Sequence, residues 1–551
     1  RGARGSRRAR RRAVTVATAP ASALQTATRI LVADPIADDG VTRLRAAGEV
    51  DVATGLAPEA LRERIGEYDA LVVRSETKVT ADVLDAATRL RVVGRAGVGV
   101  DNIDLEAATR HGILVLNAPT GNTIAAAEHA VAMMMALVRN IPVADQSLHA
   151  GRWERSKFMG MELRDKTLGV LGLGKIGFEV ARTASSGLQM RVIAHDPLVT
   201  AERATQAGAE LVEFETLLAE SDVLTVHVPL TDATRGVIGA AELGRMRAGA
   251  RLINVARGGI IDEQALADAI RGGHIAGAAI DVFTSEPPAA DNPLLAVPQI
   301  VLTPHLGAST REAQVNVAYD VADQIVEYLQ GGSPRYAVNA PTVLPEELEQ
   351  LRPYLELAQH IGSLAAQLSG GGLRRVVVSY AGELADYDTT IVTSHVLRGL
   401  FAHFTETRVN QVNAKLVAKS LGVDVDERHT TRPLDPDAPL LVEVLGAERL
   451  RIAGTQLEGE PRITRIDDFR VDMQPAGTYL VVTHQDRPGV IAAVSSLLAR
   501  NDINIAGIEL GREKPRGLAV MLMQVDDPVS TELLEEIRTT AHLERLRQVQ
   551  L

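Results

Sequence analysis

The chain has 551 residues, of which 46% are hydrophobic and 23% charged, and its net charge is −12. This length predicts several domains, and the acidic balance gives no reason to expect a nucleic-acid partner. The sequence contains no cysteine, which excludes disulfides, thiolate nucleophiles and cysteine-ligated zinc or iron–sulfur clusters. We predict no metal site, and no apolar run reaches the roughly 18 residues of a membrane-spanning helix.

The first 28 residues differ from the rest of the chain in charge. They contain seven arginines and no Asp or Glu. Arg-rich, acid-poor starts are typical of organelle transit peptides, so we predict that residues 1–28 direct the protein to a plastid (chloroplast) stroma rather than to a mitochondrion. The alternatives are a disordered basic tail or, from the run RRARRR, a nuclear signal.

Strands and helices are expected to alternate from residue 30 onward. Apolar, β-branched runs predict a first series of strands at 30–33, 50–53, 70–73, 91–94 and 113–116. Helices are expected over 80–88 and 124–139. A second series of strands is expected at 167–171, 191–195, 223–228, 250–255, 276–282 and 300–303. This alternation predicts two α/β domains, Rossmann-like or flavodoxin-like, with parallel sheets.

The remaining chain predicts two further domains. Ser309 and Glu312 fit a capping box at the start of a helix, and the Gly-Gly-Ser-Pro run at 331–334 marks a boundary. Residues 340–472 read as mixed α+β. From Thr478 the predicted order is strand, helix, strand, strand, helix, strand, which is the ferredoxin-like arrangement. The expected elements are 479–482, 490–500, 503–510, 518–525, 529–540 and 543–549.

A glycine-rich run follows the predicted strand 167–171. Gly172, Gly174 and Gly177 stand in G-x-G-x-x-G spacing at the start of a helix. In that context the glycines allow a tight turn, a close approach to a pyrophosphate and close packing of helix on strand. Asp196 closes the next strand. Its carboxylate would accept hydrogen bonds from ribose hydroxyls and repel a 2′-phosphate, so we predict NAD rather than NADP as the cofactor.

Charged residues follow the last three strands of the second series. Arg257 comes after 250–255. Asp281 and Glu286 lie at the end of 276–282, and His305 follows 300–303. Ligands bind at the carboxyl ends of such strands. A histidine can take the proton of an alcohol, a carboxylate can orient its imidazole, and an arginine can hold a substrate carboxylate. We therefore expect Arg257, Glu286 and His305 to be catalytic.

The motifs VLGLGKIGFEVA, HVPLT, NVARGGIIDE, IDVFTSEPP and TPHLGAST resemble those of the D-isomer-specific 2-hydroxyacid dehydrogenase family. The resemblance implies that residues 124–304 bind NAD and that residues 29–123 with 305–330 bind the substrate, in a cleft between the two domains. It implies that Arg257 holds the substrate, that Glu286 and His305 form the acid/base pair and that Asp281 lies near the nicotinamide. Further cofactor contacts are implied from Lys175, Ile176, Val228, Pro229, Val255 and Ala256.

Three other segments are similar to the phosphoglycerate dehydrogenases of this family: LVVRSETKVT, GRAGVGVDNID and GRWERSKFMGMEL. A substrate with a carboxylate and a phosphate needs more than one cation, and the resemblance points to Arg74, with Ser75 beside it. Trp153 is expected to anchor a dimer contact, and a homotetramer is implied. A set of basic residues beside Trp153 is expected either to reach a neighbouring subunit's site or to be a solvated helix face: Arg152, Arg155 and Lys157.

The C-terminal part resembles the long-form members of this group. Residues 340–472 are similar to their intervening domain, of an allosteric substrate-binding kind, and 478–551 to their ACT domain, which has a D-R-P-G loop as in THQDRPGVIAAV. The resemblance implies a serine effector site at the interface of paired ACT domains, with Asp486 and Asn504 as binding residues. His484 stands where some relatives have Tyr. The alternative is an ACT domain kept only for assembly.

The activity implied by the resemblance is oxidation of the small molecule 3-phosphoglycerate by NAD, the entry step of serine synthesis. A glyoxylate or hydroxypyruvate reductase of the same family is the alternative enzyme, against which Asp196 and the long C-terminal part argue. Outside enzymes, the alternative is a dinucleotide-sensing binding protein, for which RRARRR would serve as a nuclear signal. No nucleic-acid or membrane partner is expected.

Overall fold

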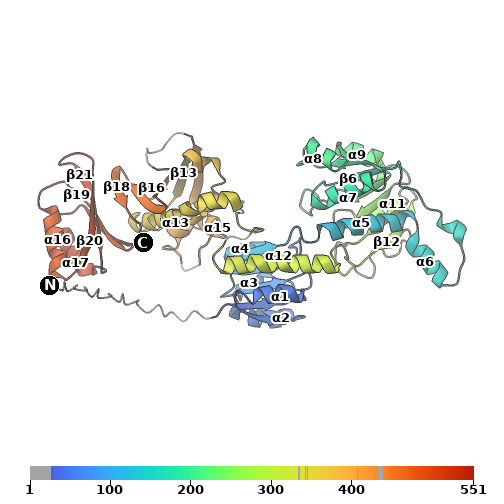
Figure 1. The fold of residues 1–551 in the computed structure, drawn as a ribbon, viewed down its shortest axis with the longest axis horizontal. Helices are drawn as coiled ribbons and strands as arrows, with labels where there is room; N and C mark the ends of the chain where they lie inside the picture. The colour runs from blue at the N-terminus through green and yellow to red at the C-terminus, as the bar shows by residue number, and fades with distance from the viewer. Residues whose placement is uncertain (1–26, 333–334, 342, 344, 406–407, 432–437) are drawn as a thin grey trace, which may run out of the picture.

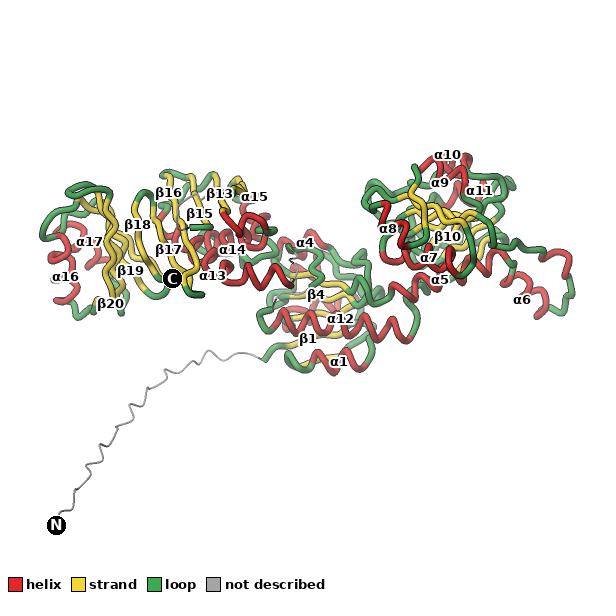
Figure 2. The backbone as a smooth tube through the Cα atoms, turned by 45° about the horizontal axis from the view of Figure 1, so that its top comes forward, coloured by secondary structure: helices red, strands yellow, loops and turns green. Residues whose placement is uncertain are grey.

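The computed structural model describes residues 27–551 apart from 333–334, 342, 344, 406–407 and 432–437. Four sheets follow one another along the chain (Figures 1 and 2). Residues 1–26 of the predicted transit segment lie outside the described residues. The same holds for residues 333–334, the second half of the predicted boundary at 331–334. The predicted fold class, two parallel α/β domains followed by two α+β domains, is confirmed.

The first sheet has five parallel strands in the flavodoxin-like order β2-β1-β3-β4-β5. They are β1 (Arg29–Val32), β2 (Glu49–Val52), β3 (Ala70–Val73), β4 (Val92–Arg95) and β5 (Leu114–Asn117). One face packs against α2 (Pro58–Arg64), the 3-10 turn η1 (Ile65–Glu67), α3 (Ala81–Asp85) and α4 (Leu105–Arg110). The other face packs against α1 (Asp38–Leu44) and the much later helix α12 (Arg311–Leu329). The chain therefore returns to its first domain after it has built the second.

The second sheet has seven parallel strands in the doubly wound order β12-β11-β10-β9-β6-β7-β8. They are β6 (Thr167–Leu171), β7 (Arg191–His195), β8 (Ala209–Leu211), β9 (Val223–Val226), β10 (Arg251–Asn254), β11 (Gly277–Ile280) and β12 (Ile300–Leu302). The short edge strand β8 was not predicted. One face packs against α5 (Thr123–Val138), α7 (Lys175–Ser186) and α8 (Ala201–Gln206). The other packs against α9 (Phe214–Glu220), α10 (Ala240–Arg245) and α11 (Glu263–Arg271).

After α5 the chain leaves this domain as an arm made of α6 (Ile141–His149) and the 3-10 turn η2 (Arg155–Phe158), seen at the right of Figure 1. Trp153, between these two elements, is 82% exposed. Among the described residues no single helix is both long and apolar enough to cross a membrane, although α5 and α6, bent by 62° at their break, meet that length and composition together.

The start of α12 corrects one prediction. Thr310 caps this helix, because its Oγ1 accepts a hydrogen bond from Ala313 N at 3.1 Å. Thr310 is the extended residue just before the helix, where a side-chain oxygen reaches the free N–H groups of the first turn. Ser309 belongs to the preceding turn, in which its N–H bonds to Leu306 O at 2.8 Å. The predicted capping box of Ser309 and Glu312 is therefore wrong.

The third sheet has six strands in the order β14-β13-β15-β16-β17-β18. They are β13 (Arg375–Ala381), β14 (Asp424–Thr430), β15 (Leu440–Leu445), β16 (Arg449–Leu457), β17 (Glu460–Ile466) and β18 (Phe469–Met473). Its helical elements are α13 (Pro345–Leu368), η3 (Gly382–Asp386), α14 (Thr390–Phe401) and α15 (Ala414–Ser420). α13 and α14 cross very closely, since a Cβ at Gly362 would lie 2.0 Å from Val396 O. The crossing therefore admits only glycine there.

A loop before α15 fastens this third domain to the first. Asn410 Nδ2 donates to Gly112 O at 2.6 Å, next to the start of β5. Val412 is 7% exposed and belongs to the core between β5 and α12. Asn339, in the connection after α12, accepts from Val115 N at 2.8 Å. These contacts attach the third domain to the domain of the first sheet.

The fourth sheet has antiparallel strands in the order β20-β21-β19-β22. Its elements are β19 (Thr478–Gln485), α16 (Val490–Arg500), β20 (Ile505–Arg512), β21 (Leu518–Val525), α17 (Thr531–Thr540) and β22 (Arg545–Gln550), which confirms the predicted ferredoxin-like order. α16 and α17 cover one face. Apolar residues of the other face, among them Tyr479 and Leu522, join the core of the third domain. The two C-terminal domains therefore share a hydrophobic core.

Candidate active site

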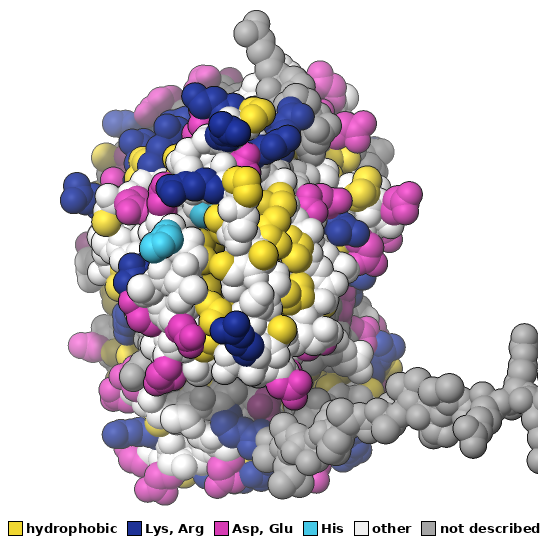
Figure 3. Space-filling view, turned by 90° about the vertical axis from the view of Figure 1, so that its left-hand side faces the viewer, with side chains coloured by type: hydrophobic (Ala, Val, Ile, Leu, Met, Phe, Trp, Pro, Cys, Tyr) yellow, Lys and Arg dark blue, Asp and Glu magenta, His cyan; other side chains and the backbone are white. Residues whose placement is uncertain are grey.

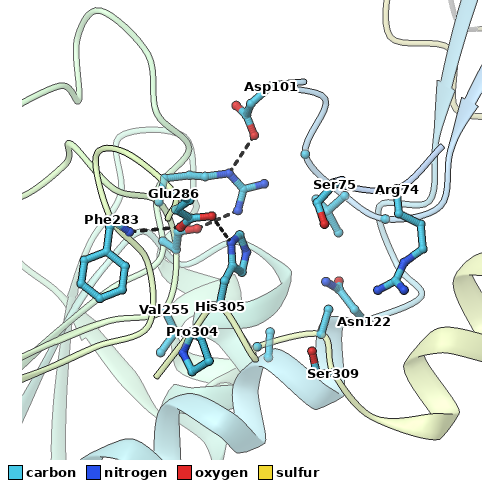
Figure 4. A pocket seen from close by; sticks show the side chains of 18 of the residues that line it. Arg74, Ser75, Asp101, Asn122, Val255, Phe283, Glu286, Pro304, His305 and Ser309 are labelled. Carbon is cyan, nitrogen blue, oxygen red and sulfur yellow. Dashed lines mark hydrogen bonds and ion pairs between the residues drawn. The ribbon is translucent and has the colours of Figure 1, made fainter. Parts of the chain in front are cut away.

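A cleft of about 1160 Å³ lies between the first two sheets, at the carboxyl ends of their strands (Figure 4). Arg74 follows β3 on one side of it, and His305 follows β12 on the other. The predicted site residues that line it are Arg74, Ser75, Ile176, Val228, Pro229, Val255, Ala256, Arg257, Glu286 and His305. Residues predicted from two separate α/β series are thereby brought to one place.

His305 and Glu286 form a hydrogen-bonded pair in this cleft. His305 Nδ1 lies 2.7 Å from Glu286 Oε2, and Glu286 Oε1 accepts from Phe283 N at 3.1 Å. Burial alone would raise the pKa of Glu286, but the hydrogen bonds from His305 and Phe283 outweigh that effect and lower the pKa. An ionised carboxylate only accepts, so the Nδ1 of His305 carries the hydrogen and Nε2 is left to exchange a proton with a substrate.

Asp281 holds the loop that carries His305. Its carboxylate is fully buried and accepts hydrogen bonds from Leu306 N at 2.8 Å and Gly307 N at 2.9 Å. Thr303 Oγ1 also donates to it at 2.5 Å, and His129 Nε2 lies 3.2 Å away. Burial would raise the pKa of Asp281, but these hydrogen bonds outweigh it and lower the pKa. His305 has a left-handed backbone (φ 53°), a strained conformation that this anchored loop maintains.

Arg257 spans the cleft from the second domain toward the first. Its Nε donates to Asp101 Oδ2 at 3.1 Å, and its Nη1 donates to Ala256 O at 2.7 Å. Asn254 fixes the turn that presents it, since Nδ2 donates to Arg257 O at 2.9 Å and Oδ1 accepts from Ala256 N at 3.0 Å. The guanidinium is therefore held in place by its backbone and by a carboxylate of the opposite domain.

The glycine loop has the shape that a pyrophosphate needs. Gly172 has φ 91°, and a Cβ there would lie 2.7 Å from Val228 Cγ1. A Cβ at Gly177 would lie 2.1 Å from Gly172 O, so helix and loop touch. Gly174, the residue before α7, has open space where a Cβ would be. The unblocked N-terminus of a twelve-residue helix presents free N–H groups, which fits the phosphates of a dinucleotide.

Asp196 closes this loop from the next strand. Its Oδ2 accepts from Leu173 N at 2.8 Å, and its Oδ1 accepts from Leu198 N at 2.9 Å. Lys175, at the start of α7, places its Nζ 5.8 Å from the ring centre of Tyr336, which follows α12. Asp196 therefore stands next to the glycine loop, with lone pairs left for a ribose.

We expect replacement of Asp196 with Ser to raise the KM for NAD about tenfold, because each lost hydrogen bond to a charged acceptor is worth roughly 1.5 kcal/mol or more. Turnover with NADP should rise, since the repelling carboxylate is gone. Initial rates with each dinucleotide measure both effects. Asp196→Asn is the matched control, because it keeps one oxygen for Leu173 N. An unchanged KM for NAD in Asp196→Ser would show that the ribose is held elsewhere.

Four residues around the cleft were missed from the sequence. Arg95, at the end of β4, and Asn122, before α5, line it. His129 contacts Asp281, as described above. His227 also lines the cleft, and burial lowers its pKa to about 4, so its imidazole is neutral near pH 7. Only the position of Arg95 and His227 next to strand ends could have signalled them.

Other predicted residues lie away from the cleft. Within the described part of the chain, the cleft lining does not include the arm residues Arg152, Arg155 and Lys157. Asp486, after β19, accepts from Arg516 N at 3.0 Å, whereas Asn504, before β20, donates to Asp526 at 2.7 Å. The strand register puts these two at opposite ends of the fourth sheet, so one chain does not bring them together. His484 is buried, and its Nε2 has no hydrogen-bond partner among the described residues.

Comparison with known families agrees with this geometry. The NAD binding domain of D-isomer specific 2-hydroxyacid dehydrogenases matches residues 131–307. The D-3-phosphoglycerate dehydrogenase intervening domain matches residues 350–467, and the ACT domain matches 478–542. The class is therefore an NAD-dependent D-isomer-specific 2-hydroxyacid dehydrogenase with two added C-terminal domains.

Similarity to individual proteins identifies the family within this class of dehydrogenases. The chain is 48% identical to D-3-phosphoglycerate dehydrogenase of Archaeoglobus fulgidus over 92% of this chain and 97% of that protein. It is 42% identical to the chloroplastic D-3-phosphoglycerate dehydrogenase 2 of Arabidopsis thaliana over 94% and 86%. The chain belongs to the D-3-phosphoglycerate dehydrogenase family. Its dehydrogenase part is also similar to the D-lactate dehydrogenase of Aquifex aeolicus solved with NAD and lactic acid (25% identity, TM-score 0.52, 57% of this chain and 100% of that one).

Proposed function

We propose that the chain oxidises 3-phospho-D-glycerate with NAD to 3-phosphohydroxypyruvate and NADH, the first step of the phosphorylated pathway of L-serine biosynthesis. The observation that carries the proposal is the cleft in which Arg257, Glu286 and His305 meet between two domains. Identity near or above 40% to phosphoglycerate dehydrogenases over nearly the whole chain supports the substrate, and does not favour a reductase of glyoxylate or hydroxypyruvate.

The proposed roles follow from the contacts. Residues 124–304 hold the cofactor on the glycine loop, and residues 29–123 with 305–330 hold the substrate. NAD, when bound, supplies the hydride acceptor. His305 Nε2 takes the proton of the C2 hydroxyl as the C2 hydride departs, so the alcohol becomes a ketone with one proton left on the imidazole. Glu286 stabilises that imidazolium through Nδ1. Asp281 positions His305 and does not itself transfer a proton.

Two cations face the two anionic groups of the substrate in this proposal. Arg257 binds the carboxylate, and Arg74, with Ser75 beside it, faces the cleft from the first domain (Figure 4). The backbone of Arg74 is held in place, because its N–H donates to the buried Asp34 at 2.6 Å. Its side chain makes only a long hydrogen bond, from Nη1 to Pro35 O at 3.4 Å. Its guanidinium is therefore lightly held and available to a ligand.

The experiment is to follow NADH absorbance with protein lacking residues 1–28, NAD and 3-phosphoglycerate, with plain glycerate as the control. We expect NADH from the phosphorylated acid only. Equal turnover of hydroxypyruvate or glyoxylate with NADPH would favour the reductase. Tight NADH binding without turnover of any hydroxy acid would favour the dinucleotide sensor and contradict the proposal.

We also propose that the ACT domain takes an amino acid, serine, as effector. Its binding residues, Asp486 and Asn504, lie at opposite ends of one sheet, so a complete site would need two chains. Four large hydrophobic residues of this domain are exposed: Ile491, Ile508, Leu510 and Leu518. Figure 3 shows hydrophobic side chains gathered at this end of the molecule. Together with the exposed Trp153 arm, they support a homotetramer with two kinds of contact. A serine series in the same assay should reduce the rate, and Asp486→Ala should abolish that reduction.

Residues 1–28 act, in our proposal, as a plastid transit peptide. Their seven arginines without an acid support it, and so do the chloroplastic relatives of Arabidopsis thaliana. A fluorescent protein fused behind residues 1–40 should enter plastids of a plant cell. Its appearance in mitochondria or the nucleus would overturn this assignment without touching the enzymatic one.

A further inference from the structure

Lys175, the first residue of α7, extends its side chain toward the first domain. Its Nζ lies 5.8 Å from the ring centre of Tyr336, in the segment that follows α12. In the part of the chain that the structure describes, Lys175 is not among the residues that line the cleft, whereas its neighbour Ile176 is. An ammonium group is attracted to the face of an aromatic ring. The glycine loop of the second domain therefore carries a cation that faces the first domain.

A carboxylate of the first domain near this cation lacks a full set of partners. Asp320 lies in the middle of α12, and its Oδ2 is buried with no hydrogen-bond partner among the described residues. Its Oδ1 has two long contacts, with Arg335 Nη2 and Gln324 Nε2, at 3.4 Å each. Burial raises the pKa of Asp320, and the positive charges of Arg335 and Lys175 oppose this effect. A buried carboxylate oxygen without a donor is costly, so a cation brought to Oδ2 would stabilise it.

The segment that carries Tyr336 is fixed to the first sheet and to α12. Tyr336 N donates to Gln324 Oε1 at 2.9 Å, and Tyr336 O accepts from Asn117 N, at the end of β5, at 3.4 Å. Gln324 is fully buried, and its Nε2 is the group that also reaches Asp320. Asp320 and Tyr336 are therefore held by one part of the first domain, and both face the loop that carries Lys175.

We propose that Lys175, Asp320 and Tyr336 form a clasp between the first two domains: the Lys175 ammonium pairs with Asp320 Oδ2 beside the Tyr336 ring and slows the release of bound dinucleotide. A pair that joins two domains has to break before they separate, and opening of a cleft commonly limits product release. The pyrophosphate is assigned to the backbone N–H groups at the start of α7, so the Lys175 side chain is left to reach the first domain. The inference rests on that proposed place of the dinucleotide and is independent of which hydroxy acid is oxidised.

The test is a double-mutant cycle of Lys175→Met and Asp320→Asn in the chain lacking residues 1–28. The measured quantity is the rate of NADH dissociation, followed by stopped-flow fluorescence when excess NAD displaces NADH. Arg182→Met is the matched control, because Arg182 is a cation of the same helix that pairs with Glu179 of its own helix, at 2.7 Å. Tyr336→Leu, compared with Tyr336→Phe, tests the ring, and a thermal melting curve for each variant separates loss of the clasp from loss of the fold.

We expect Lys175→Met and Asp320→Asn each to speed NADH dissociation about three- to tenfold, and the double variant to be no faster than the faster single variant, because both remove the same interaction. Tyr336→Leu should also speed release, and Tyr336→Phe, which keeps the ring, should do so less. Arg182→Met should leave the rate unchanged. Effects of the two single variants that multiply in the double variant would mean that Lys175 acts on the dinucleotide alone and would overturn the clasp, as would a normal rate in Asp320→Asn. A wild-type chain that binds no NADH would contradict the place of the dinucleotide itself.

Discussion

Replacement of His305 with Gln should lower kcat about 10³-fold, because general acid–base catalysis by one positioned side chain contributes roughly 10² to 10⁴. Gln can still fill the space and hydrogen bond to Glu286, but it cannot take the hydroxyl proton. The dissociation constant of NADH should stay within about threefold, since the glycine loop and Asp196 are untouched. Single-turnover kinetics with 3-phosphoglycerate, monitored as NADH absorbance, measure the loss.

The chain offers a matched control for His305. His111 also pairs with a carboxylate, since its Nε2 lies 2.6 Å from Asp85 Oδ1, but this pair is on the outer surface of the first domain. His111→Gln should therefore leave kcat unchanged. His227 cannot substitute for His305, because its pKa of about 4 and its bond to Thr225 Oγ1 at 2.9 Å keep it neutral and engaged. A His305→Gln enzyme with at least one tenth of the normal kcat would mean that another group is the base.

The pair of His305 and Glu286 should persist well into acid. The lowered pKa of Glu286 means that its carboxylate is protonated only below the usual range for glutamic acid. In the same way Asp281, with its lowered pKa, stabilises the fold above its unfolded-state pKa, and this contribution is lost as the pH falls through the lower folded-state pKa. The loop that carries His305 is thus anchored by carboxylates that do not titrate near neutrality.

Much of the site was predictable because it depends on local patterns. The spacing of Gly172, Gly174 and Gly177 is enough to predict the glycine loop. The position of His305, just after a short apolar strand, is enough to predict that it lies at a strand end. The parallel topology then brings strand ends together without further information. The helix cap at the start of α12 was predicted wrongly from local sequence. Thr310 directly follows Ser309 and can cap the same helix, and the backbone conformation decides which of the two does so.

The contacts that could not be predicted join segments far apart in the sequence. Asp101 and Arg257 are 156 residues apart and belong to different domains. His129 reaches Asp281 from a helix that looks, from its sequence, like an ordinary apolar core helix. Arg95 stands at a strand end of the first series, where a charged residue is usually solvated. Only the three-dimensional arrangement reveals that its Nε is buried with no hydrogen-bond partner among the residues that the structure describes. The burial of a polar side chain and its hydrogen-bond partners depend on how the chain packs, so they produce no periodic pattern in the sequence.

Arg257 is expected to give the second large effect. Arg257→Gln should lower kcat/KM for 3-phosphoglycerate about 10² to 10³-fold, because a bidentate, charge-assisted contact to the carboxylate is lost and Asp101 is left without its partner. Arg257→Lys should recover little, since an ammonium cannot hold Ala256 O and a substrate carboxylate with the same fork. Steady-state kinetics at fixed saturating NAD measure both variants.

The control for Arg257 is Arg247→Gln. Arg247 also donates to an aspartate at 3.1 Å, in this case Asp222 Oδ1, on the outside of the same domain. Its loss should leave kcat/KM unchanged, because exposed ion pairs contribute roughly 0–1 kcal/mol and this one is remote from the cleft. If Arg257→Gln raised KM for NAD as much as for 3-phosphoglycerate, Arg257 would be organising the cleft through Asp101 instead of binding the substrate. A selective loss for the hydroxy acid is the result that assigns the carboxylate to Arg257.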